Sequence, residues 1–127
     1  MTEKEIFVDK MKKRTKKFAV DVIFFCESLK KCKASSVIIY QLVKSATSTG
    51  VNYRAACLAR SKKEFFSKIC IVVEEIDESE YWLEVIKHAE LSDSLNELDR
   101  LLLESLELIK ITSKAKNSTY NWIYEAS

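Results

Sequence analysis

A dense run of cations near the start of the chain is the feature that most directly suggests a chemistry. Between Lys10 and Lys17, six of the eight residues are Lys or Arg. Clustered cations bind the phosphate groups of nucleic acids, with an affinity that falls steeply as salt rises. Together with cations from the middle of the chain, this run predicts a candidate nucleic-acid surface. Its residues are Lys12, Lys13, Arg14, Lys16, Lys17, Arg54, Arg60, Lys62 and Lys63.

The same cations have a simpler interpretation as a solvated helix face. No aromatic stacking motif is interleaved with them, so binding to single-stranded bases is poorly supported. Arg54 and Arg60 also fit ion pairs within or between subunits that fix the register of the helices. We favour this second interpretation for the two arginines.

Charge is divided unevenly between the two halves of the chain. Residues 1–68 hold 16 Lys or Arg and 6 Asp or Glu, a net charge of +10. Residues 69–127 hold 5 Lys or Arg and 13 Asp or Glu, a net charge of −8. Such asymmetry occurs in nucleic-acid-binding proteins. It also occurs where two halves pack together or where copies associate head to tail through complementary faces. We favour the latter group for a helical protein of this size.

Catalytic and cofactor-binding patterns are missing from the sequence. Carboxylates cluster between Glu74 and Glu78, but acidic helix faces are usually only solvated. A di-iron bundle requires Glu-x-x-His on two helices, whereas the single histidine, His88, follows Glu84 by four residues and no second motif exists. Neither a Ser-His-Asp arrangement nor a Gly-rich phosphate loop is present. The sequence therefore predicts no enzyme, no catalytic residues, no cofactor and no small-molecule substrate.

The cysteines predict free thiols rather than a metal site. None of the four stands in a CxxC pair, which structural zinc sites usually show. Three of them, Cys26, Cys57 and Cys70, are expected in the core. The N-terminus has no apolar signal segment, and no apolar run approaches the roughly 20 residues of a membrane span. We therefore expect a cytoplasmic protein that does not bind membranes.

The composition predicts an all-α fold. The chain has 127 residues, which suits one domain, and it contains one Gly and no Pro. β-Hairpins need turn signals such as Asn-Gly, and none is present. Apolar residues recur instead at helical spacing in four segments. We expect an antiparallel, up-down-up-down four-helix bundle with helices at about 2–31, 36–59, 61–90 and from 95 to between 113 and 116.

Local signals refine the helix boundaries. The expected caps are Ser35 or Ser36, Ser61 in a capping box with Glu64, and either Ser94 in a capping box with Glu97 or Asp93. The stretch "SATSTG", which ends at Gly50, is a poor helix former. We expect one helix that bends or loosens near Gly50, the alternative being a break into two shorter helices. Its small residues predict a seam where two helices approach closely.

Aromatic residues predict contacts between subunits, because aromatics are enriched at interface centres. The candidate interface residues are Tyr81, Trp82, Tyr120 and Trp122. Two of them lie in the last stretch of the chain, where no helical stripe is visible. We therefore divide the chain into a bundle, residues 1–116, and an aromatic C-terminal tail, residues 117–127, that is either mobile or an oligomer contact.

Three motifs carry a resemblance to a known family. They are "S-x-G-x-N-Y-R-x-A" at Ser48–Ala56, "ARSKKEFFSK" at Ala59–Lys68 and "E-x-D-E-S-x-Y-W-L" at Glu75–Leu83. Over about residues 10–112 the chain resembles the bacterial four helix bundle protein family. That family includes proteins encoded in intervening sequences of large-subunit ribosomal RNA genes and the accessory protein of diversity-generating retroelements. The basic start and the aromatic tail lie outside the shared core.

The resemblance implies an antiparallel bundle that assembles into a pentamer. Within the family, the retroelement accessory protein binds nucleic acid and its reverse transcriptase through a basic surface. Most other members have no assigned activity. Our prediction is therefore a non-catalytic, homo-oligomeric assembly or adaptor protein. The alternative is an accessory protein that binds RNA or DNA, and with it a reverse transcriptase.

Overall fold

Four long helices make up the part of the chain that the structure describes. The computed structural model describes residues 1–125, so the last two residues of the predicted tail lie outside the described residues. The helices are α1 (Glu3–Glu27), α2 (Lys33–Cys57), α3 (Lys62–His88) and α4 (Leu95–Tyr124). Residues 1–125 contain no strand. The predicted all-α fold with four helices is confirmed.

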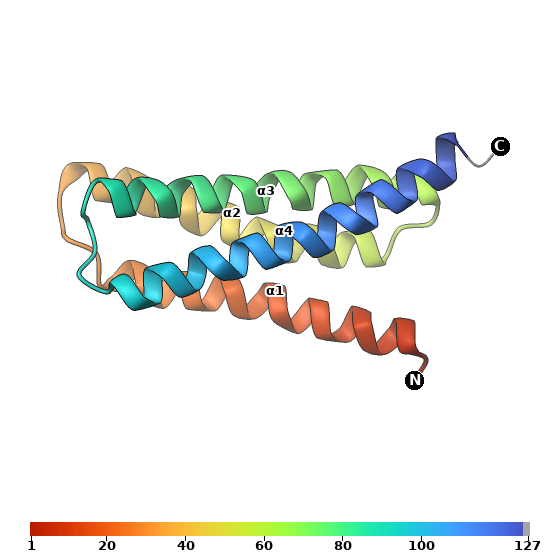
Figure 1. The fold of residues 1–127 in the computed structure, drawn as a ribbon, viewed down its shortest axis with the longest axis horizontal. Coiled ribbons are helices and arrows are strands. Elements are labelled where there is room, and N and C mark those ends of the chain that lie inside the picture. The colour runs from red at the N-terminus through yellow and green to blue at the C-terminus, as the bar shows by residue number, and fades with distance from the viewer. Residues whose placement is uncertain (126–127) are drawn as a thin grey trace.

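The connections alternate between the two ends of the molecule (Figure 1). The α1–α2 and α3–α4 connections lie at one end, where Lys30 N donates a hydrogen bond to Leu91 O at 2.9 Å. The α2–α3 connection and both termini lie at the other end. Each helix packs against its neighbours in sequence, and α1 also packs against α4, whereas the backbones of helices across a diagonal lie farther apart, with no Cα pair within 8 Å in the described chain. We call the end with the termini the open end.

The structure corrects two of the predicted caps. Cys32, not Ser35 or Ser36, caps α2: its Sγ accepts a hydrogen bond from Ser35 N, and Ser35 Oγ accepts one from Cys32 N. Ser61 caps α3 as predicted, because its Oγ accepts from Glu64 N at 3.0 Å, but the Glu64 side chain pairs with Arg60 instead of completing the predicted capping box. Ser94 is the residue before α4, but its side chain makes no cap hydrogen bond.

The predicted end of the fourth helix is wrong, since α4 continues without interruption to Tyr124. The hydroxyls of Thr112 and Thr119 donate to carbonyls one turn earlier, so these residues continue the buried face despite their polar side chains. Tyr120 lies 5.8 Å from the Phe66 ring of α3 and 4.8 Å from the Tyr124 ring. These aromatic contacts hold the last turns of α4 against the start of α3.

Gly50 lies inside one continuous helix, so the alternative of two shorter helices is wrong. The residue is buried, and a methyl group added there would lie 3.6 Å from Thr15 Oγ1 and 3.7 Å from the Thr15 carbonyl oxygen. The backbones of α1 and α2 thus approach closely at this point, as the small residues predict. Nearby, Ser45 and Ser79 form a buried hydrogen bond of 2.8 Å between α2 and α3.

Candidate functional site

Half of the cations between Lys10 and Lys17 are paired with carboxylates of the same chain. Lys13 pairs with Asp9 at 3.0 Å, and Lys17 pairs with Asp21 at 2.7 Å. Arg14 makes two hydrogen bonds to Glu104 of α4, at 2.7 and 2.8 Å. These carboxylates lower the positive potential that a phosphate group would meet.

A second ion pair joins α1 to α4. Arg100 Nη2 lies 2.9 Å from Asp21 Oδ2, which also accepts a hydrogen bond from Lys17. Burial alone would raise the pKa of Asp21, but the hydrogen bonds from Lys17 and Arg100 outweigh it, so the pKa lies below its usual value. Ion pairs therefore add to the apolar contacts between α1 and α4, such as those of the core residues Phe18 and Leu101.

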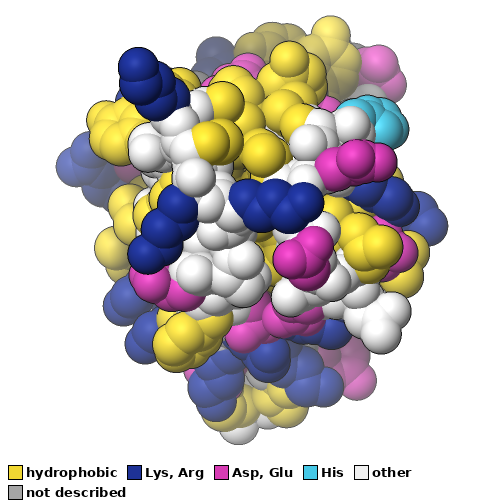
Figure 2. Space-filling model, turned by 90° about the vertical axis from the view of Figure 1, so that its left-hand side faces the viewer, with side chains coloured by type: hydrophobic (Ala, Val, Ile, Leu, Met, Phe, Trp, Pro, Cys, Tyr) yellow, Lys and Arg dark blue, Asp and Glu magenta, His cyan; other side chains and the backbone are white. Residues whose placement is uncertain are grey.

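The remaining predicted cations do not form one patch. At the open end, Arg60 pairs with Glu64 at 3.6 Å, and the Lys62 amine lies 5.4 Å above the Trp122 ring. The exposed Lys63 has no ion pair with the described residues. In the lower part of Figure 2, at the level of α1, Lys and Arg side chains are concentrated, with Asp and Glu side chains among them. The nine candidates therefore divide into several local groups.

One smaller group retains unpaired charge. Lys12 and Lys16 lie one turn apart on α1, three residues before and one residue after Thr15, and Arg54 lies one turn beyond Gly50, the residue that Thr15 contacts. Because α1 and α2 run in opposite directions, these cations belong to the same α1–α2 face. They make no ion pair with residues 1–125, and α2 contains no Asp or Glu.

The predicted interface aromatics occupy two separate regions. Tyr81 and Trp82 contact each other in the middle of α3, with ring centroids 5.0 Å apart. Trp82 is half-buried against the core, whereas Tyr81 is 56% exposed. The other pair, Tyr120 and Trp122, lies at the open end and contacts α3 of its own chain. The structure does not bring the four residues together.

The acidic stretch of α3, residues 74–84, contains six carboxylates and no cation. Burial raises the pKa of Glu80, and the neighbouring Glu84 raises it further. Burial also raises the pKa of Glu75, with an added contribution from Glu78. No group of His, Cys, Asp and Glu within residues 1–125 is arranged to hold a metal ion.

The four thiols are free but differ in environment. Cys26 is buried, and burial raises its pKa to about 11. Cys57 and Cys70 are only half-buried, so the prediction of three core cysteines holds fully for Cys26 alone. Cys32 is exposed, and hydrogen bonds from Ser35 lower its pKa.

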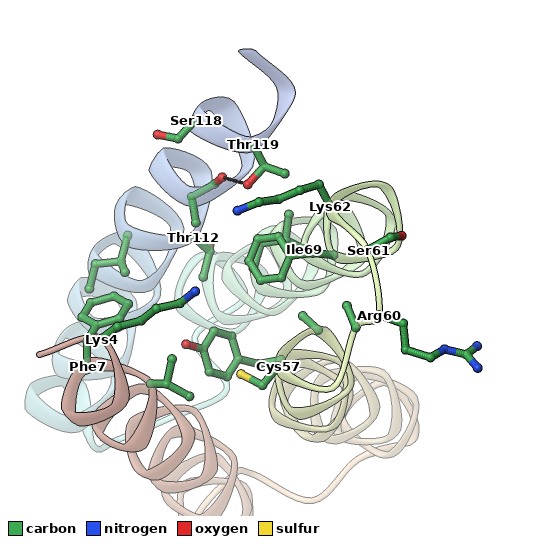
Figure 3. A pocket seen from close by; sticks show the side chains of 17 residues that line it. Lys4, Phe7, Cys57, Arg60, Ser61, Lys62, Ile69, Thr112, Ser118 and Thr119 are labelled. Carbon is green, nitrogen blue, oxygen red and sulfur yellow. Dashed lines mark hydrogen bonds between the residues drawn. The ribbon is translucent and has the colours of Figure 1, made fainter. Parts of the chain in front are cut away.

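Sequence reasoning missed a cavity of about 610 Å³ at the open end of the bundle. All four helices contribute to its walls, and Figure 3 shows it from close by. Phe7 and Val8 contribute from the first turns of α1, before the basic run of Lys10 to Lys17. The sequence signal that could have revealed the cavity is this apolar pair, which precedes the main stripe of buried apolar residues on α1. No helix of the described chain is long and apolar enough to cross a membrane.

Comparisons with known proteins give a family. A family model described as 23S rRNA-intervening sequence protein matches residues 9–114. A crystal structure of a protein of unknown function from the S23 ribosomal protein family of Bacteroides thetaiotaomicron VPI-5482 is similar, with a TM-score of 0.72 and 28% identity. The match covers 83% of this chain and 96% of that one. No curated protein matches the sequence. The chain belongs to the 23S rRNA-intervening sequence protein family.

Proposed function

We propose that this protein is a non-catalytic assembly module whose copies associate head to tail, with α1 of one copy against α3 of the next. The observation that carries the proposal is a pair of matching stripes on these two helices. The α1 stripe consists of Lys13, Lys17, Val20 and Phe24, and the α3 stripe consists of Glu74, Glu78, Tyr81 and Val85. In both, the spacing is four, three and four residues, so each set lies on one face of its helix.

The two stripes are complementary in chemistry as well as in spacing. Each begins with two charged residues, positive on α1 and negative on α3, and each continues with two apolar residues. Phe24 is 70% exposed, although it is a large apolar side chain. The Lys13 and Lys17 side chains are 79% and 68% exposed, so their pairs with Asp9 and Asp21 can rearrange at little cost. Exposed apolar residues beside charges of one sign are typical of an interaction surface.

Geometry favours a contact between different copies. Since α1 and α3 lie across a diagonal of the up-down-up-down bundle, their stripes cannot meet within one chain. The two helices run in the same direction (Figure 1), so copies related by rotation about an axis along the bundle would align the stripes in parallel. Such heterologous contacts close into a ring when the rotation permits. A pentamer is the ring that the family resemblance suggests.

The four free thiols support a reducing, cytoplasmic setting.

The proposal is tested by the mass of the protein in solution. Either a K13E/K17E variant or an E74K/E78K variant should dissociate to single chains, because each places like charges opposite one another. A chain that carries all four substitutions should assemble again, since the charges are then complementary with the signs exchanged. The control, K110E/K114E, makes the same change in charge on exposed residues of α4 and should leave the mass unchanged. Wild-type protein that remains a single chain at every concentration would overturn the proposal.

A second candidate function is binding of RNA or DNA phosphates, and a specific group of residues favours it. Lys12, Lys16 and Arg54 share one face and have no ion-pair partner in the described chain. A ring would repeat this small group around its axis, so that several weak contacts act together. Binding to structured RNA and to duplex DNA across a salt series tests it. A K12A/K16A/R54A variant should reduce both the affinity and the slope against salt. Absence of wild-type binding at low salt would exclude this candidate.

A further inference from the structure

The cavity at the open end is a space that the packing of the four helices leaves unfilled. Figure 1 shows α1 diverging from α4 toward its N-terminus, and the cavity of about 610 Å³ lies where the two helices separate. Its size is within the range of roughly 300 to 1,000 Å³ that small-molecule sites occupy. An α-helix with its side chains is about 10 to 12 Å wide, so the cavity is too small for a docking helix.

The walls of this cavity are mostly apolar. Phe7, Phe65, Ile69 and Ile111 provide large apolar side chains, and alanines from α2 and α4 add smaller ones. The hydroxyls of Thr112 and Thr119 already donate to carbonyls of α4 and need no ligand, so the Tyr53 hydroxyl is one of the few polar groups of the walls that remain. A ligand that fills the interior must therefore be largely hydrocarbon.

Two ammonium groups break this apolar character. Lys4 extends from α1 and Lys62 from α3, and in Figure 3 both amine ends turn into the opening. Arg60 points away from it and pairs with Glu64 instead. No Asp or Glu of the described chain lines the cavity, and neither lysine has an ion pair with residues 1–125. The site thus combines apolar walls with positive charge that no lining carboxylate neutralises.

We infer that this cavity binds a single-chain amphiphile with an anionic head, such as a medium-chain carboxylate. The hydrocarbon chain lies among the apolar side chains, where its burial provides most of the affinity. The carboxylate accepts hydrogen bonds from Lys4 and Lys62 at the opening, which orients the ligand. This binding does not depend on the proposed assembly, since the lining residues come from one chain and lie outside the α1 and α3 stripes.

The first test is calorimetric titration of the full-length protein with decanoate below its micelle concentration. Decanol, which lacks the charge, and inorganic phosphate, which lacks the chain, are the matched probes. We expect decanoate to bind, decanol to bind more weakly and phosphate not to bind. K4A and K62A should each weaken decanoate about tenfold, the usual effect of losing one charge-assisted hydrogen bond. K114A, on the exposed face of α4, should leave it unchanged. Equal affinity for decanoate and decanol would overturn the inferred role of the lysines.

The second test locates the ligand. Cys57 lines the cavity and Cys32 lies at the opposite end of the bundle, so each thiol reports on a different region. Saturating decanoate should slow the reaction of Cys57 with a maleimide severalfold while leaving Cys32 unaffected, as mass spectrometry of the labelled peptides would show. An A115F variant, which fills the cavity from α4, should abolish binding while the helical circular dichroism stays unchanged. Unaltered labelling of Cys57, or binding only to anionic phospholipid vesicles, would overturn the inference.

Discussion

The contact of α2 with α3 and the contact of α1 with α4 are built differently. Between α2 and α3, fully buried apolar residues such as Leu42 and Ile76 accompany a buried hydrogen bond between Ser45 and Ser79. Between α1 and α4, the notable contacts are ion pairs, and toward the open end the two helices diverge around a cavity. Burial contributes in proportion to the apolar area removed from water, about 25 cal/mol per Å². Part-exposed ion pairs contribute little, typically up to about 1 kcal/mol.

The outer face of α1 illustrates how a helix of this bundle keeps apolar residues available for partners. Apolar side chains on its outer face, such as Val20 and Phe24, remain exposed because no helix of the same chain covers them. Because the inner face of α1 buries Phe18 and Val22 in the shared core, its outer face is free to carry the charges and apolar residues of an interaction surface.

Removing the same side-chain atoms from both regions gives the largest expected contrast. Ile76→Ala in the buried α3 core should lower the free energy of unfolding by about 3 kcal/mol, because it leaves a cavity among close-packed residues. Ile6→Ala on α1, where the side chain is 44% exposed, should cost less than about 1 kcal/mol. Urea denaturation of the two variants measures both values. A similar loss in each would mean that the start of α1 is as tightly packed as the core.

The regular parts of the fold could be predicted from the sequence because apolar spacing is a local signal. The buried face of α3 and its cap at Ser61 are both visible in the sequence, and both hold in the structure. The end of α4 was missed because Thr112 and Thr119 count as polar, although each satisfies its hydroxyl within the helix. The cap by Cys32 was missed because a thiol is not a usual capping group.

The candidate site was harder to predict because its character depends on distant partners. Whether Arg14 is available to a phosphate depends on Glu104, which lies ninety residues away in sequence and is adjacent only after folding. The cavity likewise joins short segments of all four helices, none of which carries a motif. Spacing within one helix was informative, since the α1 and α3 stripes can be read directly from the sequence once their exposure is known.

Substitutions at Gly50, where α1 and α2 approach closely, should have an intermediate effect on stability. A small side chain should stabilise the protein and a large one should destabilise it. Gly50→Ala should stabilise the protein by up to about 1 kcal/mol, because the added methyl makes an ordinary contact with Thr15 and Ala favours the helix. Gly50→Leu should destabilise it by about 2 kcal/mol, since the longer side chain must push α1 away from α2. Thermal unfolding distinguishes the two. If Gly50→Leu were neutral, α1 would be free to move outward and this seam would be as loose as the α1–α4 contact.

The smallest expected effect concerns the ion pair between Arg14 and Glu104. A double-mutant cycle with Arg14→Met and Glu104→Met should give a coupling energy of about 0.5 to 1 kcal/mol, because the pair is bidentate and only partly exposed. The matched cycle on Lys13 and Asp9, a single contact between well-exposed side chains of one helix, should give about 0.3 kcal/mol and should vanish in high salt. Equal coupling in the two cycles would mean that Arg14 and Glu104 do not hold α1 against α4. The core residues of α1, such as Phe18 and Val22, would then hold the helix in place, and Gly50→Leu should have the larger effect on its position.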